Sequence, residues 1–183
     1  MGLVEQAGAA DQRSWQLTGA TLALQGGPAA VDSRAGIVYD TAMGPRIVID
    51  TSVFISALRS RRGASHGLLM LVGGSGFEIA LSVPLVVEYE DAAKRMPEAT
   101  GLGPEEVDDV IDYLCSVAHL QEIHFLWRPV LRDARDDHVL ELAVEAGCGV
   151  VVTHNIRDFA GAEDFGVEAV TPGEFLRRIG GRS

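Results

Sequence analysis

Short runs of apolar, β-branched residues, separated by segments long enough for a helix, set the strongest limit on how this chain can fold. The clearest runs are residues 47–49 and 150–152, and their unbroken apolar character is typical of strands buried on both faces of a sheet. Parallel strands need long crossover connections. We therefore predict an α/β fold, a three-layer α/β/α sandwich with a central parallel sheet of about five strands.

The other elements follow from periodicity and from turn residues. Further strands are predicted at residues 77–82, 123–127 and 166–170, and helices at about 51–58, 66–72, 84–96, 105–117, 136–145 and 175–179. Residues 1–42 show no sustained period of 3.6 or 2. We expect them to form an N-terminal extension, and residues 43–183 to form the one folded domain, within which the functional chain begins near Met43.

Composition excludes several classes of protein. The chain is 47% hydrophobic and 22% charged, which is ordinary for a globular protein, and its apolar runs fall far short of the roughly 20 residues that a membrane span needs. Cys115 and Cys148 lack disulfide or metal-site spacing, so we expect a cytoplasmic protein. The 26 acidic residues against 15 basic ones give a net charge of −11, and this acidic excess needs an explanation.

Acidic residues stand where a parallel sheet would bring them together. Asp50 follows the first predicted strand, Glu88 lies one turn into a helix, Asp136 and Asp137 open another helix, and Asp158 follows the strand that ends near Thr153. In doubly wound folds the site lies at the carboxyl ends of the strands. Two carboxylates about 4 Å apart repel by about 4 kcal/mol at an effective dielectric constant of about 20, so such a cluster needs a cation. Oxygen ligands without a Cys or His pattern favour Mg²⁺ or Mn²⁺.

Four phrases also carry a family resemblance. They are residues 47–53 (Ile-Val-Ile-Asp-Thr-Ser-Val), 86–89 (Val-Val-Glu-Tyr), 132–138 (Arg-Asp-Ala-Arg-Asp-Asp-His) and 151–159 (Val-Val-Thr-His-Asn-Ile-Arg-Asp-Phe). In this order they closely resemble PIN-domain ribonucleases, and in particular the toxins of toxin–antitoxin pairs, over residues 45–180. The resemblance implies a metal-dependent endonuclease that cuts RNA to leave a 5′-phosphate and a 3′-hydroxyl, an antitoxin partner and a homodimer.

The resemblance assigns roles residue by residue. Asp50 matches the first acid of the family and Glu88 the second. The third is Asp136 when counted back from Ala143, or Asp137 when counted back from Thr153, and the sequence leaves both open.

The fourth acid is also open. Many relatives carry it two residues after the threonine, where this chain has Asn155, and others have the asparagine followed by an acid at the place of Asp158. Asn155 can still offer a carbonyl oxygen or hold a water. The hydroxyls of Ser52 and Thr153 are expected to orient the carboxylates.

Basic residues near the predicted site are candidates for RNA binding: Arg59, Arg61, Arg62, Arg135 and Arg157. Simpler roles stand beside each functional one. The arginines at the end of the first helix complement its dipole, Asp50 can act as a helix cap, and we expect His138 and His154 to be ordinary surface or core residues rather than substrate contacts.

Two other functions compete with the nuclease. A metal-dependent phosphatase of the haloacid-dehalogenase type would carry Asp-x-Asp after the first strand, and Ser52 stands where its second aspartate would be. A catalytically weak or inactive binding module on the same fold is compatible with Asn155.

Overall fold

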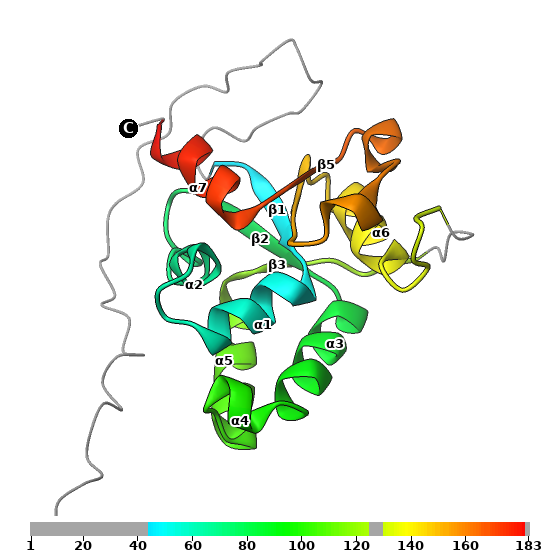
Figure 1. Cartoon of the computed structure of the whole chain (residues 1–183). Helices are drawn as coiled ribbons and strands as arrows, with labels where there is room; N and C mark the ends of the chain where they lie inside the picture. The colour runs from blue at the N-terminus through cyan, green and yellow to red at the C-terminus, as the bar shows by residue number, and fades with distance from the viewer. Residues whose placement is uncertain (1–43, 125–129, 182–183) are drawn as a thin grey trace, which may run out of the picture.

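The chain folds around a parallel sheet of five strands in the part that the structure describes, residues 44–124 and 130–181 of a computed structural model. The strands are β1 (Arg46–Ile49), β2 (Glu78–Leu81), β3 (His119–Leu120), β4 (Val150–Val152) and β5 (Glu168–Val170). Their order in the sheet is β3-β2-β1-β4-β5, and every neighbouring pair is parallel. Helices flank this sheet (Figure 1), so the predicted three-layer α/β/α sandwich is confirmed.

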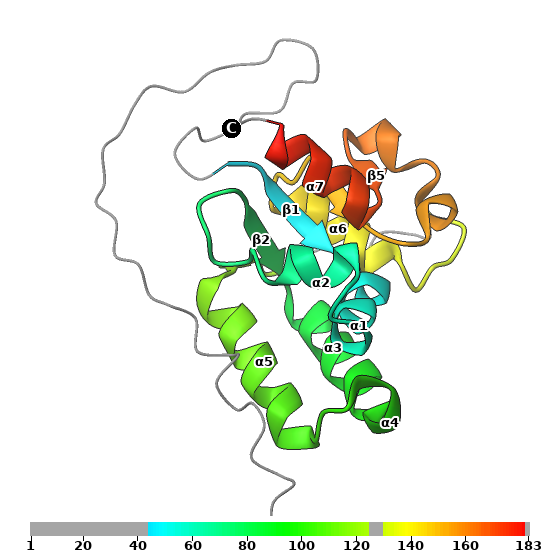
Figure 2. The same cartoon turned by 60° about the vertical axis from the view of Figure 1, so that its left-hand side comes forward.

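The helices are α1 (Thr51–Arg59), α2 (Ala64–Leu69), α3 (Val83–Lys94), α4 (Pro97–Thr100), α5 (Pro104–Val117), α6 (Asp137–Glu145) and α7 (Pro172–Gly180), with short 3₁₀ turns η1 (Ile156–Phe159) and η2 (Ala162–Phe165). Helix α6 packs on β1, β2 and β4, and α7 packs on α2. Helices α3, α4 and α5 lie together in a lobe beyond the end of the sheet (Figures 1 and 2).

Strand β1 is central because its residues are apolar on both faces. Ile47, Val48 and Ile49 are at most 3% exposed, and they pair in register with residues 150–152 of β4. This alignment places the carboxyl ends of β1 and β4 side by side. The backbone of Asp50 extends the pairing, because its N–H donates to the carbonyl of Val152 at 2.9 Å.

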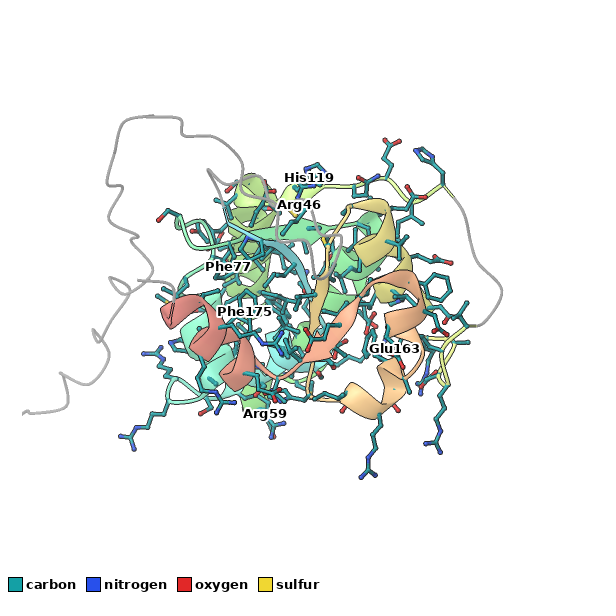
Figure 3. All side chains as sticks on the ribbon, turned by 90° about the horizontal axis from the view of Figure 1, so that it is seen from above. Arg46, Arg59, Phe77, His119, Glu163 and Phe175 are labelled. Atoms are coloured by element: carbon teal, nitrogen blue, oxygen red, sulfur yellow. The ribbon has the colours of Figure 1, made fainter. Side chains whose placement is uncertain are left out.

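Aromatic residues fill the space between the sheet and its helices. The rings of Phe54 and Tyr89 are stacked with centroids 4.3 Å apart, which joins α1 to α3. Phe77 and Phe175 meet edge to face at 5.3 Å (Figure 3). These contacts hold α3 and α7 against the rest of the domain.

One predicted strand is wrong. Residues 123–127 were expected to form the third strand, but that strand is His119–Leu120. Ala80 of β2 pairs with His119, so the chain joins the sheet as soon as α5 ends at Val117. Residues 121–124 have no regular structure, and residues 125–127 lie outside the described part of the chain.

Helix α4 was not predicted either. The predicted N-terminal extension lies outside the described residues. Within the described ranges, no helix combines the length and the apolar character that crossing a membrane requires.

Candidate functional site

Asp50 lies between β1 and α1, and its carboxylate is held by two hydroxyl groups. The residue is 5% exposed. Its Oδ2 accepts a hydrogen bond from Thr153 Oγ1 at 2.8 Å and another from Ser52 Oγ. Asp50 occupies the N-cap position of α1, yet its side chain makes no capping hydrogen bond. The carboxylate is therefore fixed from two elements without being used as a helix cap.

The same hydroxyls hold the loop after β4. The N–H of Asn155 donates to Thr153 Oγ1 at 2.9 Å, and the N–H of His154 donates to Ser52 Oγ at 3.3 Å. Ser52 and Thr153 thus make the contacts with Asp50 that the sequence predicts for them. The imidazole of His154 is in turn 2.9 Å from the hydroxyl of Ser65, a residue that is 2% exposed.

Glu88 reaches the site from α3 and pairs with His138 of α6. Glu88 Oε2 lies 2.9 Å from His138 Nε2, and this partner lowers the pKa of Glu88 against the opposing effect of burial. Burial disfavours the charged imidazole, but the close contact with Glu88 and the charge of Glu88 outweigh this effect and raise the pKa of His138. Both changes favour the ion pair.

Asp136 precedes α6 and carries the clearest electrostatic sign of a carboxylate cluster. Burial is the largest cause that raises its pKa to about 6, and the negative charges of Asp50, Asp133, Asp158 and Glu88 follow in that order. Tyr89 is affected in the same way, since burial and then the charges of Asp50 and Glu88 raise its pKa. Acids from three other segments of the chain therefore act on Asp136.

Asp137, the neighbour of Asp136, is engaged elsewhere. Its carboxylate accepts hydrogen bonds from the N–H of Leu131 at 2.8 Å and from the N–H of Val130 at 3.2 Å, and the residue is 8% exposed. Asp137 fixes the backbone before α6, so the geometry favours Asp136 as the third acid. Asp158 lies in η1, partly buried, and reaches the cluster through its charge on Asp136.

The predicted arginines lie on three separate segments of the chain. Arg59, Arg61 and Arg62 are exposed at and after the end of α1, where Arg59 is labelled in Figure 3. Arg135 pairs with Asp133 at 2.8 Å, and its charge also helps to lower the pKa of Glu88. Arg157 is exposed and lines a cavity of about 650 Å³ beside β5 and α7. None of the predicted acids lines this cavity.

Three residues at the site make contacts that the sequence does not predict. Tyr89 is spaced like a core residue, with Leu85 and Ala93, yet its hydroxyl donates to the carbonyl of Ile49, directly before Asp50. His138 is the partner of Glu88, although an ordinary role was expected for it. Ser65 stands at the start of a short helix with no pattern around it, so no sequence signal points to its contact with His154.

The donor chemistry of the cluster fits a divalent ion, because its oxygen atoms are those that Mg²⁺ and Mn²⁺ prefer and because burial, followed by the charges of neighbouring carboxylates, raises the pKa of Asp136. The side chains are nevertheless not gathered tightly. Among residues 44–124 and 130–181, no three His, Cys, Asp or Glu side chains are grouped so that they could hold a metal ion.

The comparison with protein families agrees with this geometry. A family model described as PIN domain matches residues 46–157, a span that includes β1, α3, the start of α6 and β4. The chain belongs to the PIN-domain family. No curated protein matches the sequence. PIN domains are generally nucleases, so membership supports a hydrolase in general, and the PIN-domain match covers all the predicted acids except Asp158.

Proposed function

We propose that this PIN domain is a metal-dependent endoribonuclease that hydrolyses phosphodiester bonds in RNA. The observation that carries the proposal is the electrostatic coupling of Asp136 to Asp50, Asp158 and Glu88 at the carboxyl edge of the sheet. These residues lie on four segments of the chain, and mutual repulsion makes their gathering unfavourable unless a cation is bound there at some stage.

In this proposal Asp50, Glu88, Asp136 and Asp158 hold Mg²⁺ or Mn²⁺. A bound divalent ion supplies Lewis-acid chemistry, which activates water and stabilises negative charge at the phosphorus. The contribution of the protein is preorganisation. Thr153 and Ser52 fix the Asp50 carboxylate before any substrate arrives, and they also fix the backbone of the loop that carries Asn155.

The basic residues would contact the RNA backbone. Arg59, Arg61 and Arg62 are exposed beside α1, and Arg157 is exposed beside Asp158. Phosphate contacts position a nucleic acid without reading its sequence. With a net charge of −11, we expect weak binding that falls steeply with salt and strengthens with divalent ions.

The finer assignment is a toxin of a toxin–antitoxin pair. It rests on the order and spacing of the four sequence phrases and would give the chain an antitoxin partner and a homodimeric state. Co-expression with the product of the adjacent reading frame, followed by co-purification and suppression of RNA cleavage, tests this assignment. A neighbouring product that neither binds nor inhibits the protein contradicts it.

The nuclease proposal is tested by cleavage of a fluorogenic RNA in Mg²⁺. We expect the wild type to cleave, and Asp50→Asn and Glu88→Gln to lose at least about 100-fold in rate, because each removes a carboxylate charge from the cation site. Glu90→Gln is the matched control, since Glu90 lies on the same helix but pairs with Lys94. Equal rates in wild type and Asp50→Asn, or no cleavage by wild type, would contradict the nuclease proposal and favour an inactive binding module.

A further inference from the structure

His138 lies against Glu88, one of the carboxylates of the proposed metal site. We propose that His138 is a positioning residue that holds Glu88 in the metal-free site, and that a divalent cation must displace this imidazole to bind Glu88. The inference deepens the proposed function and rests on it, because it concerns the same carboxylate site.

The first step is the position of the imidazole. His138 Nδ1 lies 2.7 Å from the carbonyl oxygen of Arg135, and Nε2 lies 2.9 Å from Glu88 Oε2. The Nε2 contact is close but lacks the alignment of a hydrogen bond. The ring therefore lies directly against the Glu88 oxygen that a cation would need to reach.

The second step is that His138 is fixed in position. It stands in the first turn of α6, directly after Asp137, whose carboxylate binds the backbone of Val130 and Leu131. The His138 side chain is 20% exposed and that of Glu88 is 42% exposed. The histidine is held by the Arg135 carbonyl and by the backbone contacts of its neighbour Asp137. Glu88 projects from a helix and is more exposed, so Glu88 is the group that can move.

The third step is the weak participation of Glu88 in the acid cluster. Among the carboxylates that act on Asp136, Glu88 has the smallest effect. In the described ranges no three potential ligands are yet grouped to hold a metal ion. Turning Glu88 away from His138 would add its carboxylate to Asp50 and Asp136, so the ion pair and the metal compete for one side chain.

Competition predicts an unusual result: removing His138 should tighten metal binding. The affinity of the wild type includes the loss of the Glu88–His138 contact, and a variant without that contact has no such loss. For a pair that is partly exposed, the expected gain in affinity is about two- to fivefold. A histidine that helped to present Glu88 to the metal would give the opposite sign.

The test is titration of the full-length protein with Mn²⁺ alone, by isothermal titration calorimetry, without RNA. His138→Ala removes both contacts of the imidazole, and His138→Asn keeps a donor for the Arg135 carbonyl while removing the contact with Glu88. His124→Gln is the control, since His124 is an exposed histidine beside Glu122. A circular-dichroism melt shows that each variant is folded, and either His138 variant alone is sufficient for the comparison.

We expect a dissociation constant for Mn²⁺ that is about two- to fivefold lower in both His138 variants and unchanged in His124→Gln. Equal or weaker binding in the His138 variants overturns the proposal, while Asp50-dependent binding by the wild type would leave the proposed nuclease site intact. Binding by His138→Ala but not by the wild type supports the competition. No binding by either protein overturns both proposals.

Discussion

At the scale of single residues, the buried Asp50 carboxylate shows how this chain holds a charge in place. Two hydroxyls bind the same oxygen, one from the start of α1 and one from the end of β4. These hydrogen bonds fix the rotamer of a side chain that is buried and has little room to move. Groups that orient a metal ligand in this way affect affinity and rate by about 10- to 100-fold in metal sites.

The Thr153 hydroxyl can be tested directly. Thr153→Val keeps the shape of the side chain but leaves Asp50 Oδ2 and the Asn155 N–H without this partner, so we expect RNA cleavage to fall by about 10-fold or more. Thr153→Ser, which keeps the hydroxyl, should retain most of the activity. Steady-state rates at saturating Mg²⁺ measure the difference, and similar losses in both variants would contradict the role of the hydroxyl.

Asp136 should destabilise the metal-free protein when it is ionised. The raised pKa of its carboxyl, about 6, means that folding disfavours the charged form, so its unfavourable effect on stability grows as the pH rises through about 4 to 6. In EDTA, Asp136→Asn should therefore raise the melting temperature more at pH 8 than at pH 4.5. A gain that is the same at both values, measured by thermal denaturation, would show that Asp136 does not feel its acidic neighbours.

At the scale of elements, α3 links the site to the core. It carries Glu88 towards the site and Tyr89 towards the interior, where the Tyr89 ring stacks on Phe54 and its hydroxyl binds the carbonyl of Ile49. Successive residues on a helix point about 100° apart, as 3.6 residues per turn requires. One turn of α3 thus both fixes the end of β1 and supplies an acid.

Loss of the Tyr89 hydroxyl should loosen this link. Tyr89→Phe keeps the stacked ring but leaves the buried Ile49 carbonyl without its side-chain donor, which should lower the free energy of unfolding by about 1 to 3 kcal/mol. Tyr113→Phe is the matched control. Its hydroxyl also binds a backbone carbonyl, that of Val72 at 3.0 Å, but from a partly exposed position, so its loss should cost less. Urea denaturation gives both values, and a smaller effect for Tyr89→Phe would contradict the link.

At the scale of the whole molecule, the acidic balance and the proposed site make stability depend on divalent ions. With an assumed dissociation constant of about 1 mM, 10 mM Mg²⁺ should stabilise the fold by about 1.4 kcal/mol. Asp50→Asn should show little of this effect. Melting curves with Mg²⁺, Mn²⁺ and EDTA measure it, with matched ionic strength to separate site binding from screening. Curves that do not respond to either ion would count against a metal site.

The sequence predicts the α/β architecture well because the hydrophobic patterns that determine the central strands are strong. Each buried run of β-branched residues at 47–49 and 150–152 has one favourable environment, the interior of a parallel sheet. The third strand was misplaced because residues 123–127 have the apolar and aromatic character of a strand. A pair of residues at the sheet edge, His119 and Leu120, joins the sheet by its position after α5 rather than by composition.

The site was harder to predict at the level of contacts. Spacing alone left Asp136 and Asp137 open, since two adjacent residues at a helix start face different directions, and only the backbone groups that bind Asp137 separate them. The roles of His138 and Tyr89 depend on the approach of α6 to α3 and of α3 to β1. Such contacts come from tertiary packing, which periodicity does not encode.

The hydrogen bond between Asp50 and Thr153 joins residues 103 positions apart. This separation determines when, during synthesis of the chain, the proposed site can form. Chains emerge from the ribosome amino end first. Until β4 has been synthesised and has cleared the exit tunnel, Asp50 has neither the Thr153 hydroxyl nor the Val152 carbonyl to hold it. A growing chain that already carries Asp50, Glu88 and Asp136 is therefore without its assembled site until β4 has been made and can pair with β1.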